Sequence, residues 1–126
     1  NDLANGTFEV ARRDTLTKET VISADIVTYI QDLLELIQKN LFDKAFAFRD
    51  AHITEVNSWE EFKDVLDNKT GFVSAHWDGT SETEEKIKDL TKATIRCIPL
   101  NRKEEAGICV LTGAPSAGRV LFAKAY

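Results

Sequence analysis

The segment Gly113–Gly118, with a glycine at each end, has the glycine spacing of a phosphate-binding loop. In such a loop the second glycine is followed by Lys, which reaches the phosphates, and by Ser or Thr, whose hydroxyl holds magnesium. Arg119 and Val120 occupy those two places here. A helix must also follow, so that its N–H groups point at the phosphate, whereas Arg119–Ala123 has the composition of a strand. We therefore predict a turn at residues 113–118 and no nucleotide site.

The two cysteines suggest different roles. Cys97 occupies an alternating position in an expected strand, and small thiols are among the most buried side chains, so we expect it in the core. Cys109 is followed by Thr112 at the spacing of a Cys-x2-Cys zinc knuckle. One thiolate cannot hold a structural zinc, which takes four nitrogen or sulfur ligands. The only histidines are His52 and His76, and a meeting of His76 with Cys109 would supply two ligands, at best a weak site.

Potential nucleophiles and acid–base groups elsewhere lack partners at a recognisable spacing. Nucleophilic catalysis needs a Ser or Cys next to His or another base, so we expect the chain alone to be inactive and to hold no cofactor. The 21 Asp and Glu residues suit the solvated faces of helices. Arg12 and Arg13 have two open interpretations: they contact phosphate, or they pair with Asp14 or a neighbouring domain.

Composition excludes several classes of protein. The 126 residues suffice for one core, and 43% hydrophobic with 29% charged residues is typical of a soluble globular chain. A net charge of −5 does not fit a free-standing nucleic-acid binder, which needs clustered Lys and Arg. No apolar run approaches the ~20 residues of a membrane span, and two cysteines make no disulfide framework. We expect a cytoplasmic protein without a membrane partner.

The elements that position these residues follow from periodicity. Residues 7–13 alternate as in a half-buried strand, and a polar turn with a short second strand follows. Ser23 offers an N-cap, and residues 24–50 place one apolar stripe along a helix without Gly or Pro. The stripe comprises Ile26, Ile30, Leu33, Ile37, Leu41, Ala45 and Phe48. We predict one long amphipathic helix.

Helices and strands alternate after residue 51. We expect helices after Ser58 and near 82–92, the latter with Ile87 and Leu90 inward. Expected strands are 52–56, 71–77, 93–100, 108–111 and 119–123. This order predicts the α+β class: a two-layer α/β domain with a small mixed sheet, preceded by the long amphipathic helix.

A series of short segments matches one family in order and spacing. They are Val10–Thr15, the long helix running into Leu41–Ala45, Trp59–Phe62, Gly71–Val73, Cys97–Pro99, Cys109-Val110 and Leu121–Tyr126. Together they resemble the C-terminal region of prolyl-tRNA synthetases of the archaeal/eukaryotic-like type, which also occurs in some bacteria. The resemblance implies that residues 1–21 are the tail of the anticodon-binding domain and residues 22–126 the C-terminal domain. Because the chain begins with Asn1 and contains no Met, we expect a piece of a longer protein.

In many members of that family the C-terminal domain binds zinc through two cysteine pairs. The resemblance places the first pair at Asp78 and about Thr83, and the second at Cys109 and Thr112. Because one cysteine of four remains, we expect zinc to be absent. We hypothesise that packing of residues such as Trp77 and Val110 replaces its stabilisation.

The resemblance also implies a function. The parent would be a class II aminoacyl-tRNA synthetase, a proline–tRNA ligase using ATP and Mg²⁺, expected to be a homodimer that binds tRNA(Pro). This part would be architectural, partnering the catalytic and anticodon-binding domains of the same chain and placing the carboxylate of Tyr126 near the active site. The alternative is a free-standing α/β protein-interaction module that uses the long helix as its docking face.

Overall fold

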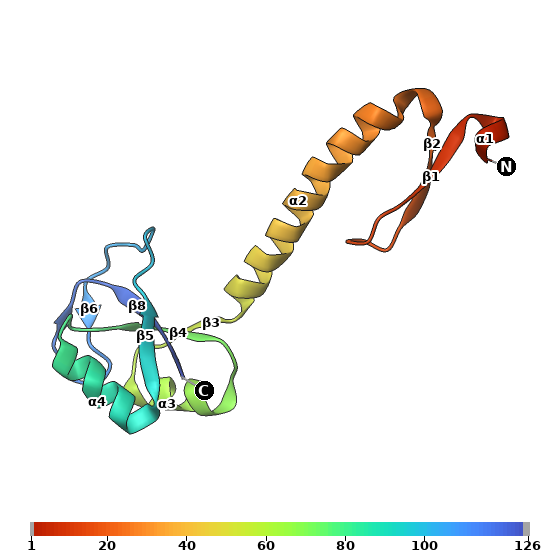
Figure 1. Ribbon diagram of the computed structural model, residues 1–126. Helices are drawn as coiled ribbons and strands as arrows, with labels where there is room; N and C mark the ends of the chain where they lie inside the picture. The colour runs from red at the N-terminus through yellow and green to blue at the C-terminus, as the bar shows by residue number, and fades with distance from the viewer. Residues whose placement is uncertain (1, 125–126) are drawn as a thin grey trace. The chain divides into compact units, whose positions relative to one another are not determined.

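The computed structural model describes residues 2–124. It comprises two compact units, Asn1–Phe48 (unit 1) and Arg49–Tyr126 (unit 2), which are described separately (Figure 1). This division falls near the end of the long helix, whereas the family resemblance places a domain boundary at residues 21 and 22. No helix in the described part of the chain is long and apolar enough to cross a membrane.

Unit 1 is a hairpin followed by a helix. The elements are α1 (Asp2–Asn5), β1 (Thr7–Ala11), β2 (Lys18–Ile22), a 3₁₀ turn η1 (Ser23–Asp25) and α2 (Ile26–Ala51), whose last residues belong to unit 2. The strands pair antiparallel, with Thr7 opposite Ile22 and Ala11 opposite Lys18. Both predicted strands are therefore confirmed. Ser23 does not begin α2 as predicted, because the 3₁₀ turn intervenes and the helix starts at Ile26.

The long amphipathic helix is confirmed as α2. Good helix formers without Gly or Pro continue it for 26 residues. Of its predicted apolar stripe only Leu33 is fully buried, while Leu41 and Phe48 are exposed. The helix therefore carries more apolar surface than unit 1 covers.

Unit 2 is the predicted two-layer α+β domain. Its elements are β3 (Ile53–Glu55), α3 (Trp59–Asn68), β4 (Phe72–His76), α4 (Ser81–Thr91), β5 (Ala93–Cys97), β6 (Gly107–Ile108), β7 (Pro115–Ser116) and β8 (Arg119–Lys124). The main sheet has the order β3-β4-β8-β5. It is mixed, since β3 and β4 are parallel and β8 is antiparallel to both of its neighbours. β6 and β7 form a separate antiparallel pair.

Local signals fix where the two short helices begin. The Ser58 hydroxyl accepts the Glu61 N–H at 3.2 Å, and the Glu61 carboxylate accepts the Asn57 N–H at 2.8 Å, which caps α3. Thr80 caps α4 by accepting the Thr83 N–H at 3.3 Å. α4 ends at Thr91, and its C-cap Lys92, with a positive φ of 63°, turns the chain directly into β5.

The core of unit 2 lies between the sheet and α3 and α4. Val73 and Ala75 of β4 alternate inward, as do Val120 and Phe122 of β8. Phe62 of α3 meets Phe122 edge to face, with ring centroids 5.1 Å apart. Val56, Val65, Ile87, Ala93 and Val110 complete the buried cluster, with Trp77 packed against it.

Two predicted core residues are exposed. Cys97 is exposed because a bulge between Ile95 and Cys97 sets Cys97 opposite Leu121 rather than Val120, which reverses its face. Leu90 is 65% exposed. The buried line of α4 runs from Thr83 to Ile87 in steps of four residues, so Leu90, three residues after Ile87, lies to the side of it.

Candidate functional site

Asp78 and Thr83, the positions that the family resemblance assigns to the first cysteine pair, meet at one carboxylate. Asp78 follows β4, and Thr83 lies in the first turn of α4. Thr83 Oγ1 donates to Asp78 Oδ2 at 2.7 Å. Thr80 donates to Asp78 Oδ1 twice, from its backbone N at 3.1 Å and from Oγ1 at 2.9 Å. Asp78 thus accepts hydrogen bonds from two residues at the N-terminal end of α4.

The second pair reaches the same carboxylate through Thr112. Thr112 Oγ1 donates to Asp78 Oδ2 at 2.8 Å. Thr112 lies in a turn in which the Gly113 N–H donates to the Cys109 carbonyl at 2.9 Å and the Cys109 N–H to the Ala114 carbonyl at 2.8 Å. Cys109 itself is 2% exposed. The structure therefore joins Asp78, Thr83 and Thr112, and buries Cys109 in the turn that carries Thr112.

The environment keeps Asp78 ionised. Partial burial raises its pKa, but the hydrogen bonds from Thr83, the Thr80 backbone, Thr112 and the Thr80 hydroxyl outweigh that effect and lower it to about 2, from 3.8. The charge also lies at the N-terminal end of α4, where the helix dipole favours an anion. The four residues Asp78, Thr80, Thr83 and Thr112 are called the Asp78 cluster below.

The Asp78 cluster does not suit a structural zinc ion. Zinc of that kind takes four nitrogen or sulfur ligands, whereas the donors here are one carboxylate and threonine hydroxyls that already donate to it. Within residues 2–124 no group of three or more His, Cys, Asp or Glu side chains is arranged to hold a metal ion. His76 and Cys109 do come near along the backbone, since the Val110 N–H donates to the His76 carbonyl at 3.2 Å, but the His76 ring has other partners.

Those partners form a second polar cluster that the sequence did not reveal. His76 is 5% exposed, and its Nδ1 lies 3.1 Å from Ser116 Oγ and its Nε2 3.4 Å from Glu105 Oε1. The three residues have the types of a hydrolytic triad. Ser116, however, is only 7% exposed and donates to the Gly118 carbonyl at 3.0 Å. The Ser116 hydroxyl is thus buried and engaged in a hydrogen bond with the backbone.

Arg119 completes this cluster. Its Nη1 donates to the Val56 carbonyl at 2.9 Å and the Ser74 carbonyl at 3.3 Å, and its Nε lies 3.5 Å from Glu105 Oε1. The hydrogen bond with His76, and Arg119 nearby, lower the pKa of Glu105. Sequence spacing gives no hint of the cluster, since its members come from β4, β7, β8 and a loop.

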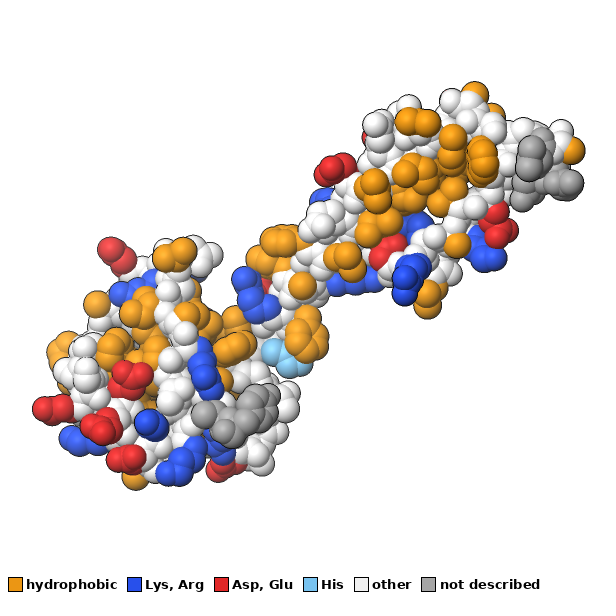
Figure 2. All heavy atoms as spheres, viewed as in Figure 1, with side chains coloured by type: hydrophobic (Ala, Val, Ile, Leu, Met, Phe, Trp, Pro, Cys, Tyr) orange, Lys and Arg blue, Asp and Glu red, His pale blue; other side chains and the backbone are white. Residues whose placement is uncertain are grey.

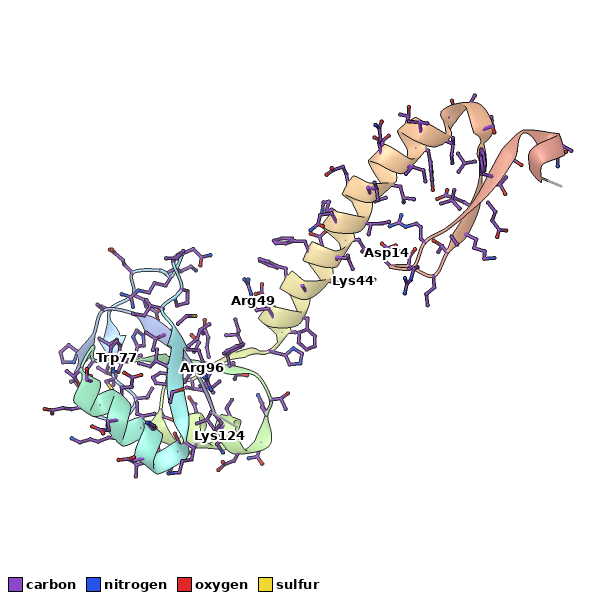
Figure 3. The ribbon with its side chains drawn as sticks, in the orientation of Figure 1. Asp14, Lys44, Arg49, Trp77, Arg96 and Lys124 are labelled. Carbon is purple, nitrogen blue, oxygen red and sulfur yellow. The ribbon has the colours of Figure 1, made fainter. Side chains whose placement is uncertain are left out.

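In unit 1, Arg12 is paired within the unit. Its Nε and Nη2 donate to the two Asp14 oxygens at 3.2 and 2.8 Å. Asn40 of α2 donates to Asp14 Oδ2 at 2.7 Å, and Lys44 donates to the Asp14 carbonyl at 2.7 Å, so the hairpin tip lies against the helix (Figure 3). These bonds, Arg12 first, hold the pKa of Asp14 well below its usual range. Arg13 is exposed.

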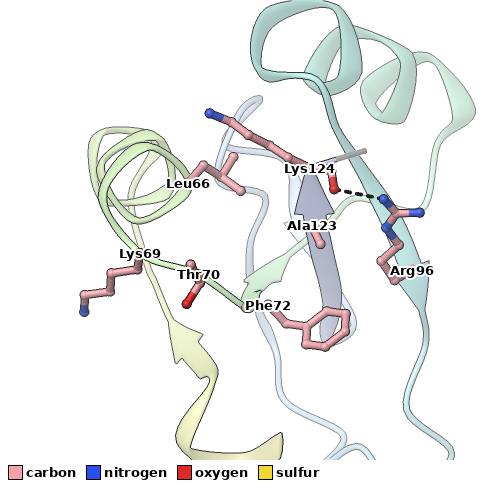
Figure 4. Close-up of a pocket in the computed structure, with 8 residues that line it drawn as sticks. Leu66, Lys69, Thr70, Phe72, Arg96, Ala123 and Lys124 are labelled. Carbon is pink, nitrogen blue, oxygen red and sulfur yellow. Dashed lines mark hydrogen bonds between the residues drawn. The ribbon is translucent and has the colours of Figure 1, made fainter. Parts of the chain in front are cut away.

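A shallow hollow of about 680 Å³ lies at one end of the sheet in unit 2 (Figure 4). Lys69, Phe72, Arg96 and Lys124 contribute to its lining. Arg96 donates to the Lys124 carbonyl at 3.0 Å, and the Lys124 ammonium pairs with Asp67 at 2.6 Å. Among the described residues, the lining has no carboxylate, thiol or imidazole and so supplies no acid–base pair. Tyr126, the other predicted site residue, lies outside the described residues.

The fold and the site define a class of protein: a small two-layer α+β module in which side-chain hydrogen bonds, rather than reactive groups, link the loops. Comparison with known proteins gives the family. Residues 59–126 match the family model described as prolyl-tRNA synthetase, C-terminal. Because this match covers more than half of the chain, the chain belongs to that family, as its resemblance predicted.

Curated relatives extend the similarity to nearly the whole chain. Over 125 residues it is 71% identical to a proline–tRNA ligase of Flavobacterium johnsoniae, covering 99% of this chain and 25% of the relative. Proline–tRNA ligases of Porphyromonas gingivalis and Cytophaga hutchinsonii are 58% and 56% identical over 125 residues, again with 99% of this chain and 25% and 26% of the relative. The chain spans about a quarter of the length of the curated relatives it matches.

Proposed function

We propose that this chain is the non-catalytic C-terminal part of a proline–tRNA ligase, a class II synthetase that activates proline with ATP and Mg²⁺ and transfers it to tRNA(Pro). The observation that carries the proposal is the 71% identity over 99% of the chain to a relative four times its length. The side chains that suggested chemistry are engaged in structure: Asp78 with threonines, and His76 with Ser116 and Glu105.

The role we propose is architectural, and unit 1 supports it. Its buried apolar residues, within the described part, are Val21 and Leu33. Large apolar side chains remain exposed over the hairpin and α2, as the hydrophobic band in Figure 2 shows. They include Phe8, Leu16, Ile22, Val27, Leu34, Leu36, Leu41, Phe42, Phe46 and Phe48. A monomer rarely exposes a patch of this kind, so we assign it to packing against the rest of the anticodon-binding domain, which lies outside this chain.

Substitution on this band tests the architectural role. Phe42 is 62% exposed, and its ring lies 6.0 Å from that of Phe46. In the parent enzyme Phe42→Ser is expected to lower the Tm by several degrees, because a covered aromatic side chain is lost. In the 126-residue chain it should leave the Tm nearly unchanged. The control is Gln38→Ser, also exposed on α2. Equal effects of the two substitutions in the parent would contradict the role.

The catalytic side of the proposal concerns Tyr126. The matching terminal residues support a carboxylate placed near the active site of the catalytic domain. Deletion of Tyr126 from the parent is expected to lower kcat/KM for aminoacylation by roughly a hundredfold, since loss of positioning is costly even where reacting groups are intact. The Tm of the parent should not change. Unchanged aminoacylation would reject this role, and proline-dependent pyrophosphate exchange by the 126-residue chain alone would reject its non-catalytic character.

Further parts of the proposal follow from the family. The quoted sequence segments support the archaeal/eukaryotic-like type, as it occurs in bacteria, and the parent is proposed to be a cytoplasmic homodimer. Residues 1–21 are assigned to the anticodon-binding domain. Arg12 and Arg13 are proposed as tRNA or interdomain contacts. Because Arg12 is committed to Asp14, Arg13→Gln is expected to weaken tRNA binding by the parent more than Arg12→Gln does, measured as the salt-dependent Kd.

A further inference from the structure

We propose that the Asp78 cluster links, without a metal, the two segments that a zinc ion links in metal-containing members of the family. It ties the start of α4 to the turn that carries Cys109 and Thr112. The comparison with zinc-containing members rests on the proposed function. The link that the hydrogen bonds to Asp78 make between the two segments does not.

Segments that are distant in sequence converge on Asp78. Asp78 and Thr80 precede α4, Thr83 lies in its first turn, and Thr112 comes from a turn 34 residues after Asp78. A structural metal ion links loops that are remote in sequence. Here one carboxylate oxygen, Asp78 Oδ2, makes that link by accepting from Thr83 and Thr112 at 2.7 and 2.8 Å.

The Asp78 carboxylate is saturated with hydrogen bonds. An ionised carboxylate offers about four lone-pair sites. Asp78 Oδ1 accepts two hydrogen bonds from Thr80, and Oδ2 accepts one each from Thr83 and Thr112. A bound cation would have to displace these donors. The cluster is therefore a complete structural unit rather than a metal site lacking its ion.

The Asp78 cluster lies next to core residues on both of the segments that it links. Thr83 is 3% exposed and lies one turn before Ile87, which is fully buried. On the other side, Cys109 and Val110 are 2% and 8% exposed, and Val110 belongs to the hydrophobic core. Separation of Thr112 from Asp78 would free the turn that leads Val110 into the core, so the cluster should contribute to global stability.

The first experiment measures stability of the 126-residue chain by thermal and urea unfolding. Thr112→Val removes the donor at nearly constant volume, and Asp78→Asn replaces one accepting oxygen with a donor. Each is expected to lower the Tm by roughly 5–10 °C. The double variant should lower it by less than the sum of the two decreases, because both substitutions affect the same hydrogen bond between Thr112 and Asp78. The controls are Thr70→Val and Glu85→Gln, both exposed. Variants that melt no lower than their controls would overturn the proposal.

The second experiment rebuilds the metal site. The native chain is expected to contain less than about 0.1 zinc per chain and to keep its Tm in chelator. The triple variant Asp78→Cys/Thr83→Cys/Thr112→Cys, which has four thiols with Cys109, is expected to bind about one zinc per chain and to lose Tm in chelator. Stoichiometric zinc in the native chain, or no zinc in the triple variant, would refute the proposal that the Asp78 cluster takes the place of a zinc site. Neither readout depends on aminoacylation, so failure here is distinct from failure of the proposed function.

Discussion

Gly107 and His76 show at the residue scale how a loop is held against the sheet. Glu105 contacts the His76 ring at 3.4 Å, and two residues later Gly107 lies directly on that ring. A Cβ at Gly107 would lie 2.3 Å from His76 Nε2 and 2.4 Å from Cε1. The ring cannot easily move, because it is buried and its Nδ1 contacts Ser116. Glycine is required here for lack of space.

Gly107→Ala is therefore expected to destabilise the chain by about 1–3 kcal/mol, the usual cost of overpacking. Equilibrium urea unfolding measures it. His76→Ala supplies the control, because removing the ring makes room for the new methyl group. The loss of unfolding free energy in the Gly107→Ala/His76→Ala double variant should be smaller than the sum of the losses in the two single variants. Strict additivity would show that Gly107 is not restricted by the ring.

The sequence predicted single residues well where one local rule acts. The helix after Ser58 and the strand after Gly118 were predicted correctly, whereas the turn expected at residues 113–118 contains the short strand β7. It failed for Cys97, since a bulge depends on the partner strand. The family resemblance assigned Asp78, Thr83 and Thr112 to cysteine positions, but the bond from Thr112 to Asp78 joins residues 34 apart, and no local pattern predicts it.

At the scale of elements, contacts between β1–β2 and α2 organise unit 1. Asp14 at the hairpin tip accepts from Asn40 and pairs with Arg12, and Tyr29 of α2 donates to Glu19 of β2. Two-stranded hairpins are marginal by themselves. The long helix was predictable because its period is sustained, whereas the polar contacts that hold the hairpin to it were not.

Asp14→Asn is expected to loosen the hairpin from the helix. The amide keeps the shape of the side chain but loses the charge that Arg12 pairs with, and one of its atoms becomes a donor. Amide exchange in Thr7–Ala11 should accelerate by roughly tenfold, while the core of unit 2 is unaffected. The matched control is Asp43→Asn, which breaks an exposed pair with Lys39 and should have little effect. Equal amide exchange rates in the two variants would show that Asp14 does not hold the hairpin against α2.

At the scale of the whole molecule, the two units differ in how much apolar surface they bury. The hydrophobic core cluster lies entirely in Arg49–Tyr126, and the family match at residues 59–126 falls within the same unit. Residues 49–126 expressed alone are expected to unfold cooperatively by circular dichroism, with a Tm within a few degrees of the 126-residue chain. Residues 1–48 should show no cooperative transition. A non-cooperative melt of residues 49–126 would contradict this division of stability.

Acid should destabilise the whole chain in a defined range. The folded-state pKa of Asp78 is about 2, below its ordinary 3.8, and that of Asp14 is also lowered. A lowered folded-state pKa contributes stability that is fully present above the unfolded pKa and is lost as the pH falls through the folded one. We expect a nearly constant Tm from pH 7 to about 5 and a decline from about pH 4 towards 2. The Asp14→Asn/Asp78→Asn double variant should decline less steeply, and an equal decline would exclude these two carboxylates as its cause.

The proposed link through the Asp78 cluster has a consequence for how the domain would respond to oxidants and to metal starvation. Thiolates that hold zinc are oxidised by peroxide, and their metal is then released. The hydroxyls of Thr80, Thr83 and Thr112 and the carboxylate of Asp78 undergo no such reaction, and Cys109 is shielded by burial. On the proposal that the Asp78 cluster links this domain without zinc, neither zinc limitation nor oxidation of zinc-bound thiolates would unfold it, and within the described residues the exposed thiol open to oxidation is that of Cys97.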